Sequence, residues 1–147
     1  MTISLIPSAA FVNSELISEF GLLPPSFLAV GNKRLYVRQY SLLHEFSSKI
    51  FLSLPEGFKI PQMDQKIIKD LGIEIIFVPE GISLGESIIY VLNTIAVINE
   101  PCRINFGDTL IDSTIDLEET DCFSVVEKTN QYYRQGFCKK ENQSYYF

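Results

Sequence analysis

The sequence has little of several residue types on which common functional sites depend. It contains no Trp, one His and three Cys among 147 residues. His44 with Cys102, Cys122 and Cys138 cannot make a zinc site at the usual ligand spacings, and there is no CxxC pair. The odd cysteine count favours reduced thiols in the cytoplasm, with Cys102 and Cys122 as ordinary core residues in apolar segments.

Basic residues and long apolar runs are also scarce. Twelve Lys and Arg stand against eighteen Asp and Glu, for a net charge of −6. This charge disfavours nonspecific binding to nucleic acid and docking to an anionic membrane, because both need cationic surfaces. No apolar run reaches the roughly 18 residues of a membrane span. The apolar start ISLIPSAAFV lacks the basic region of a signal peptide. We therefore expect a cytoplasmic protein with no membrane span and no nucleic acid partner.

The apolar residues that are present fall into short runs typical of buried strands. Apolar residues make up 46% of the chain and charged residues 20%, as in a globular domain. The runs are nearly continuous in Ile, Val, Leu and Phe, which indicates strands buried on both faces, as in parallel sheets. They predict strands at 3–6, 50–54, 73–78, 102–106 and 123–126.

Segments with helical spacing lie between these runs. Apolar stripes predict helices at 14–20, 35–46, 63–71 and 84–98. The third stripe starts at Met63, and Gly72 follows it as a C-terminal stop. Ser83, with Glu86 three residues later, predicts a capping box at the start of the fourth.

The alternation of strands and helices predicts an α/β fold, a three-layer sandwich with a mostly parallel sheet. Ligands in such sheets bind beyond the carboxyl ends of the strands. Ser8, Glu56, Glu80 and Asp108 each follow a predicted strand. We interpret both glutamates as turn residues. Asp108 is expected on the edge of the sheet where chemistry would occur.

Asp108 follows Gly107 in the motif RINFGDTLID. A carboxylate at this place can bind Mg²⁺, which takes its remaining ligands from phosphate oxygens and water. A turn residue that accepts hydrogen bonds from exposed N–H groups is the alternative. The residues leave both readings open.

Two glycine-containing segments are further candidates. Lys33 and Arg34 follow Gly31 and could hold a phosphate, with Arg38 on the same helical face. The alternative is an exposed turn that leads into a helix. Gly85 lies in the first turn of a predicted helix, whose N–H groups can bind an anion, and capping alone is the alternative there.

Three segments together resemble the nucleotide-binding half of the sugar-phosphate nucleotidyltransferases. GLLPPSFLAVGNKRLYVRQYSLL (21–43) resembles the block in which a Pro-Lys pair leads to a small strand, a Gly-rich turn and a helix. VPEGISLGES (78–87) resembles the turn that starts a helix beside the base. RINFGDTLI (103–111) resembles the strand that ends in the magnesium-binding Asp. The resemblance spans residues 1–128 and extends especially to divergent nucleotidyltransferase-like proteins of capsule and surface-polysaccharide clusters.

The resemblance implies a GT-A-like, Rossmann-like half-domain that holds a nucleoside triphosphate. The activity it implies is transfer of a nucleotidyl group to a sugar phosphate, in sugar-nucleotide or capsular polysaccharide biosynthesis. The site residues expected for this activity are Lys33 as the catalytic cation that holds phosphate, and Ser8, Ala9, Gly31 and Gly85 as nucleotide-binding residues. The resemblance implies Asp108 as the ligand of Mg²⁺.

The chain departs from the family where catalysis depends on particular side chains. The place of the family's Gly-rich loop with an Arg holds IPSAAFVNSEL, and the family's catalytic Lys falls at Pro25. Residues 129–147, polar and aromatic, are expected to be the tail of a truncated chain that lacks the sugar-binding half. The alternative function is therefore a degenerate or truncated domain that binds a nucleotide, a sugar nucleotide or a partner without turnover. An apolar sheet edge exposed by early termination would also favour a homodimer or poor solubility.

Overall fold

The computed structural model describes residues 2–96, 100–111, 139–141 and 144–146. The chain divides into two compact units, Met1–Asp116 and Leu117–Phe147. The second unit contributes an antiparallel hairpin of β7 (Lys139–Glu141) and β8 (Ser144–Tyr146), which the sequence did not predict. The predicted domain boundary at 128 and the predicted strand at 123–126 lie outside the described residues.

The first unit is built on a four-stranded sheet in the order β5-β4-β1-β6, and every pairing in it is parallel. The strands are β1 (Ile3–Pro7), β4 (Lys49–Pro55), β5 (Glu74–Val78) and β6 (Cys102–Ile104). All five residues of β1 are buried, as expected for a strand in the middle of a parallel sheet. The predicted α/β fold with a mostly parallel sheet is confirmed.

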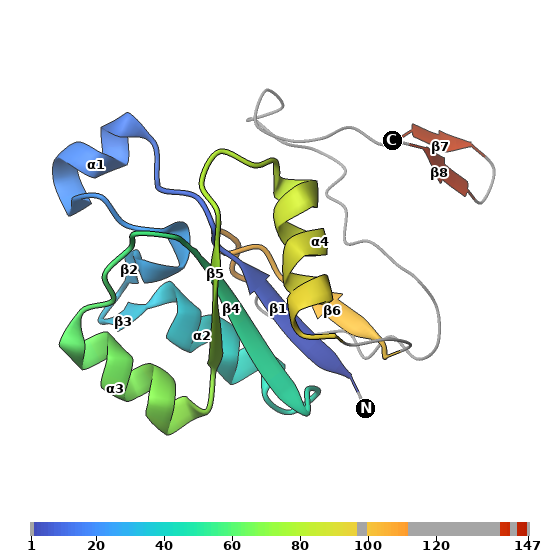
Figure 1. Cartoon of the computed structure of the whole chain (residues 1–147), viewed down its shortest axis with the longest axis horizontal. Helices are drawn as coiled ribbons and strands as arrows, with labels where there is room; N and C mark the ends of the chain where they lie inside the picture. The colour runs from blue at the N-terminus through green and yellow to red at the C-terminus, as the bar shows by residue number, and fades with distance from the viewer. Residues whose placement is uncertain (1, 97–99, 112–138, 142–143, 147) are drawn as a thin grey trace. The chain divides into compact units, whose positions relative to one another are not determined.

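Helices cover both faces of this sheet and give three layers. They are α1 (Ser14–Phe20), α2 (Leu35–Leu43), α3 (Gln62–Leu71) and α4 (Leu84–Thr94). In Figure 1, α4 lies in front of the sheet and α2 behind it. No described helix has the length and apolar character needed to cross a bilayer.

Alternate strand residues supply the two halves of the core. Ile6 and Leu52 pack with Tyr36 of α2 and with residues of α3 on one face. Leu5 and Phe51 pack with Val91 of α4 on the other. This alternation explains why the strand sequences are nearly continuous in apolar residues.

The helix ends follow local sequence signals. Gly72 takes a left-handed conformation (φ 70°) and ends α3 as predicted. Ser83 and Glu86 form the predicted capping box of α4, although α4 ends at Thr94. The assignment of Met63 to the buried stripe of α3 is wrong, because its side chain is 76% exposed. Asp64, one turn before Ile68, takes the inward position instead.

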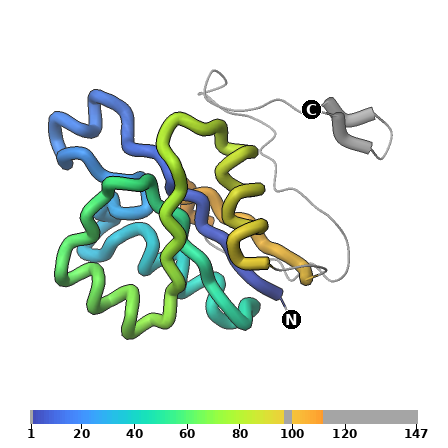
Figure 2. Tube along the Cα trace, in the orientation of Figure 1, coloured from blue at the N-terminus to red at the C-terminus, as the bar shows by residue number. Residues whose placement is uncertain are grey.

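A long connection between β1 and α2 contains elements that periodicity did not predict. The 3-10 turn η1 (Pro25–Phe27) precedes a small hairpin of β2 (Ala29–Val30) and β3 (Lys33–Arg34). These elements are too short for their residue pattern to stand out. In Figure 2 this connection leaves β1 in blue and reaches the start of α2 in pale blue.

Candidate functional site

Ser8 and Gly107 meet at the carboxyl edge of the sheet, beyond β1 and β6. Ser8 is 3% exposed, and its hydroxyl accepts a hydrogen bond from the Ser26 N–H at 3.1 Å. Gly107 donates its N–H to the Pro7 carbonyl at 2.8 Å. A Cβ atom at position 107 would lie 2.6 Å from that carbonyl oxygen and 2.7 Å from Ser8 Cβ. Glycine is therefore required at 107 by close packing, and this packing covers the Ser8 side chain.

Asp108 follows on the same edge of the sheet with an exposed side chain. Its Oδ1 accepts a hydrogen bond from Thr109 Oγ1 at 2.9 Å. Gln39 Nε2 of α2 holds the surrounding loop by donating to the Phe106 and Thr109 carbonyls at 2.9 and 2.8 Å. Among the described residues, no three His, Cys, Asp or Glu side chains gather as a possible metal site. Asp108 can supply one ligand to a Mg²⁺ ion whose other ligands are phosphate and water.

Ala9 and Gly85 lie towards the α4 layer. Ala9 packs against the core cluster of Leu5, Phe51 and Val91. Gly85 stands in the first turn of α4, and a Cβ added there would meet nothing within 4 Å. The predicted nucleotide-binding residues Ser8 and Ala9 thus contact opposite layers of the fold.

Gly31 and Lys33 lie together in a groove at the β2–β3 turn. Gly31 has φ 66°, which the turn needs and which a residue with a side chain rarely adopts. The groove has a volume of about 600 Å³, within the range of small-molecule sites. Ser8, Ala9, Gly85 and Asp108 are not among the residues that line it. Its lining residues are Ala29, Gly31, Asn32, Lys33, Arg34, Val37, Met63, Asp64 and Ile67.

The groove lies towards the carboxyl ends of the strands. α3 follows β4 and leads to the parallel strand β5, so its first turns lie nearest the carboxyl end of β4. Met63, Asp64 and Ile67 of these turns line the groove. Neither α2 nor α3 has a side-chain cap on its first-turn N–H groups. The groove is therefore in the region where ligands of parallel α/β sheets bind.

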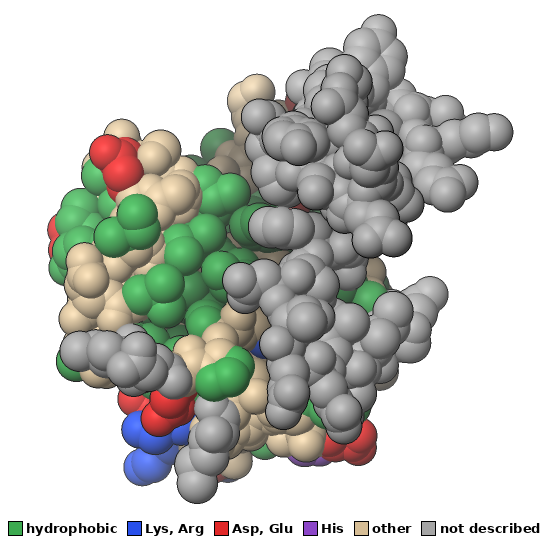
Figure 3. Space-filling model, turned by 90° about the vertical axis from the view of Figure 1, so that its right-hand side faces the viewer, with side chains coloured by type: hydrophobic (Ala, Val, Ile, Leu, Met, Phe, Trp, Pro, Cys, Tyr) green, Lys and Arg blue, Asp and Glu red, His purple; other side chains and the backbone are tan. Residues whose placement is uncertain are grey.

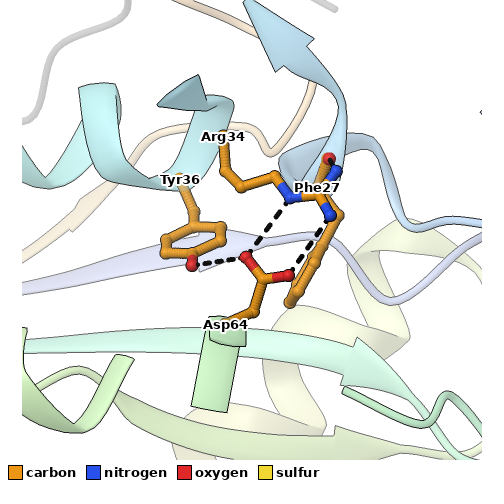
Figure 4. Close-up of polar contacts among 4 residues, drawn as sticks. All are labelled: Phe27, Arg34, Tyr36 and Asp64. Carbon is orange, nitrogen blue, oxygen red and sulfur yellow. Dashed lines mark hydrogen bonds and ion pairs between the residues drawn. The ribbon is translucent and has the colours of Figure 1, made fainter. Parts of the chain in front are cut away.

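An ion pair with a buried carboxylate and a partly exposed guanidinium forms one wall of the groove (Figure 4). Arg34 donates from Nε to Asp64 Oδ1 and from Nη2 to Asp64 Oδ2, both at 3.2 Å. Arg34 Nη1 donates to the Phe27 carbonyl at 2.8 Å, and Tyr36 donates its hydroxyl to Asp64 Oδ1 at 2.8 Å. The bidentate pairing fixes the plane of the guanidinium.

The burial of these groups sets their electrostatics. The Asp64 side chain is 4% exposed and that of Arg34 is 31% exposed. Burial, followed by the hydrogen bond to Asp64, raises the pKa of Tyr36 well above its ordinary value. Lys33 is exposed beside the pair. Since Arg34 and Asp64 neutralise each other, Lys33 leaves the groove with a net positive charge.

Asp64 is the residue that sequence reasoning missed. It stands four residues before Ile68 and seven before Leu71, so it shares their helical face. An acid on an apolar face indicates a buried partner, because a lone buried carboxylate is costly. Nothing in the sequence identifies Arg34, thirty residues earlier, as that partner.

Exposed apolar side chains also gather on α4 and β6. Figure 3, which views the side where α4 and β6 lie, shows hydrophobic side chains over much of the described surface. Ile89 of α4 is 59% exposed, and Ile104 of β6 is 41% exposed. β6 is an edge strand of the four-stranded sheet.

Two comparisons with known proteins gave no match. No family model matches the chain, and no curated protein matches it. The family resemblance therefore rests on the three segments, and the structure supplies the arrangement of their residues.

Proposed function

We propose that this chain is a nucleotidyltransferase-like protein that binds the phosphates of a nucleoside triphosphate in the groove at Gly31 and Lys33. One observation carries the proposal: a glycine turn and an exposed lysine share a groove near the carboxyl ends of a parallel sheet. Glycine lets backbone N–H groups approach a phosphate closely, and lysine neutralises its charge.

The proposed reaction is transfer of a nucleotidyl group to a sugar phosphate in the cytoplasm, for sugar-nucleotide or capsular polysaccharide synthesis. An oxygen of the sugar phosphate attacks the α-phosphorus, the bond to the bridging oxygen breaks, and pyrophosphate leaves. The chain contributes by positioning the phosphates and by neutralising charge through Lys33. Mg²⁺ at Asp108 would add further neutralisation, and it remains a prediction because Asp108 does not line the groove.

Binding without turnover is the second candidate, and two observations favour it. The Ser8 hydroxyl is buried and already accepts a hydrogen bond from the chain. Pro25, at the place of the family's catalytic lysine, begins the η1 turn and has no cation to offer. Under this candidate the groove holds a nucleotide or sugar nucleotide as a recognition site.

Calorimetric titration of the full chain with nucleoside triphosphates, with and without magnesium, tests binding. We expect Lys33→Ala to weaken binding about tenfold, since a hydrogen bond to a charged group contributes roughly 1.5–3 kcal/mol. Lys59→Ala is the matched control, because Lys59 is exposed and does not line the groove. Equal affinity of both variants for the nucleoside triphosphate would show that the groove is not the binding site.

Two further measurements separate the candidates. Release of pyrophosphate with a panel of sugar phosphates indicates transfer, whereas binding without release indicates the second candidate. Magnesium dependence that is equal in wild type and Asp108→Ala would remove Asp108 from the site.

The predicted homodimer is also retained as a proposal, supported by the exposed Ile104 on the edge strand β6. Light scattering tests it. A monodisperse monomer at high concentration would count against the homodimer.

A further inference from the structure

Arg34 has hydrogen-bonding capacity that the fold does not use. A guanidinium has five N–H donors. Asp64 accepts two of its hydrogen bonds and the Phe27 carbonyl accepts one. Five minus three leaves two N–H groups, on Nη1 and Nη2, without a partner among these contacts.

The free donors lie on a side chain that reaches the groove. Arg34 lines the groove and its side chain is 31% exposed, whereas its partner Asp64 is 4% exposed. The carboxylate is thus enclosed and fully engaged, with three hydrogen bonds donated to its two oxygens. A ligand in the groove would meet the cationic half of the pair.

We infer that Arg34, held in place by Asp64, binds one phosphoryl group in the groove through its free N–H donors, together with Lys33. This inference rests on the proposed function and adds to it the residue that recognises the ligand. The titratable side chains that line the groove are Lys33, Arg34 and Asp64, so their summed charge is positive.

The chemistry selects a phosphoryl group with at least two free oxygens. A planar guanidinium presents N–H donors to two oxygens of the same group, and a preorganised one loses little freedom on binding. Lys33 adds a point charge beside it. Pyrophosphate supplies this chemistry without a base or a sugar, so it is the probe of choice.

The test compares Arg34→Lys with Arg103→Lys. Both variants keep the net charge, and Arg103 of β6 does not line the groove; its guanidinium lies 5.1 Å from the centroid of the Phe46 ring. We expect pyrophosphate to bind Arg34→Lys about tenfold more weakly than wild type, and Arg103→Lys within twofold of it. Equal affinities for all three proteins would overturn the inference while leaving the proposed function intact.

A second measurement uses the wild-type chain and covers the case in which Arg34→Lys does not fold. The side-chain N–H resonances of Arg34 are followed by NMR during titration with pyrophosphate. They are expected to shift and to saturate with the same dissociation constant as the calorimetric titration. Saturable binding with unmoved Arg34 resonances would overturn the inference alone. No binding by the wild type would overturn the inference and the proposed function together.

Discussion

Two glycine turns near the same end of the sheet differ in what surrounds them. At Gly107 the backbone presses against Pro7 and Ser8, and an added Cβ would lie 2.6 Å from a backbone oxygen. At Gly31 the nearest atom to an added Cβ is the flexible end of Arg38, at 2.8 Å, and a groove lies beside the turn. One glycine is required by packing between segments far apart in the sequence. The other is required by a turn that leaves space for a ligand.

The difference teaches that a glycine turn at the carboxyl edge of the sheet can serve packing rather than ligand binding. Strand order places the switch point of the sheet between β1 and β6, where a ligand is expected in open α/β folds. In this chain the Gly107 turn covers Ser8 at that point. The open groove lies instead between the β2–β3 turn and the first turns of α2 and α3.

Removing Asp64 should have the largest effect on stability, because it leaves the Arg34 guanidinium without its carboxylate partner. We expect Asp64→Ala to lower the free energy of unfolding by about 3 kcal/mol, the low end for a broken buried pair, since Arg34 is partly solvated. Denaturant unfolding measures this change. Asp70→Ala is the control, because Asp70 is exposed on the same helix. A similar small loss of stability in Asp64→Ala and Asp70→Ala would show that the Arg34–Asp64 ion pair contributes little to stability.

Adding a methyl group at the Gly107 turn should have the second largest effect on the free energy of unfolding. We expect Gly107→Ala to cost about 2 kcal/mol, because the new methyl group meets backbone and Ser8 atoms that cannot move away freely. Gly85→Ala provides the contrast: its methyl group meets open space in a helix and should stabilise by about 0.5 kcal/mol. Tolerance of alanine at 107 would mean that the Ser8 side chain is less enclosed than described.

A methyl group added at the Gly31 turn should lower stability less than one added at Gly107. We expect Gly31→Ala to lower stability by about 1 kcal/mol, because φ is 66° and the end of Arg38 can move aside. Gly72→Ala has a similar φ of 70° and open space, so it measures the conformational penalty alone. Chemical denaturation of the two variants should give equal losses. If Gly31→Ala lost as much stability as Gly107→Ala, the Gly31 turn would not have the free space beside it that we describe.

The smallest effect should appear at alkaline pH. Burial and the contact with Asp64 raise the pKa of Tyr36 in the folded chain. Above the unfolded pKa of about 10, the unfolded chain releases this proton and the folded chain keeps it, so stability falls as pH rises. Unfolding measured from pH 8 to 11 should therefore show a shallower decline in Tyr36→Phe than in wild type. Parallel curves would mean that Tyr36 titrates normally when folded.

The sequence predicted the elements of the sheet better than the sites. Buried strands and amphipathic helices have local signatures, so β1, β4, β5, α1 and α3 fall close to the predicted ranges. The short β2–β3 hairpin has no such signature. Its position depends on Arg38 and Arg34, whose side chains bind the Val30 and Phe27 carbonyls.

The candidate residues show the same limit. Sequence reasoning correctly expected Ser8 and Asp108 on one edge of the sheet, since strand ends follow from the strand order. The contact of Gly107 with Ser8 joins segments far apart in the sequence, and packing of that kind has no local pattern. Asp64 had a local sequence signal, because it is an acid on an apolar helical face. Its partner Arg34 had no such signal.

Amide NMR of the wild-type chain during titration with a nucleoside triphosphate and magnesium tests the central claim most directly. The groove predicts saturable shifts centred on Gly31, Asn32 and Lys33, with the resonances of Ser8 and Gly85 unmoved. Shifts centred on Ser8, Gly85 and Asp108, with the Gly31 turn unmoved, would contradict the account and place the ligand at the switch point of the sheet.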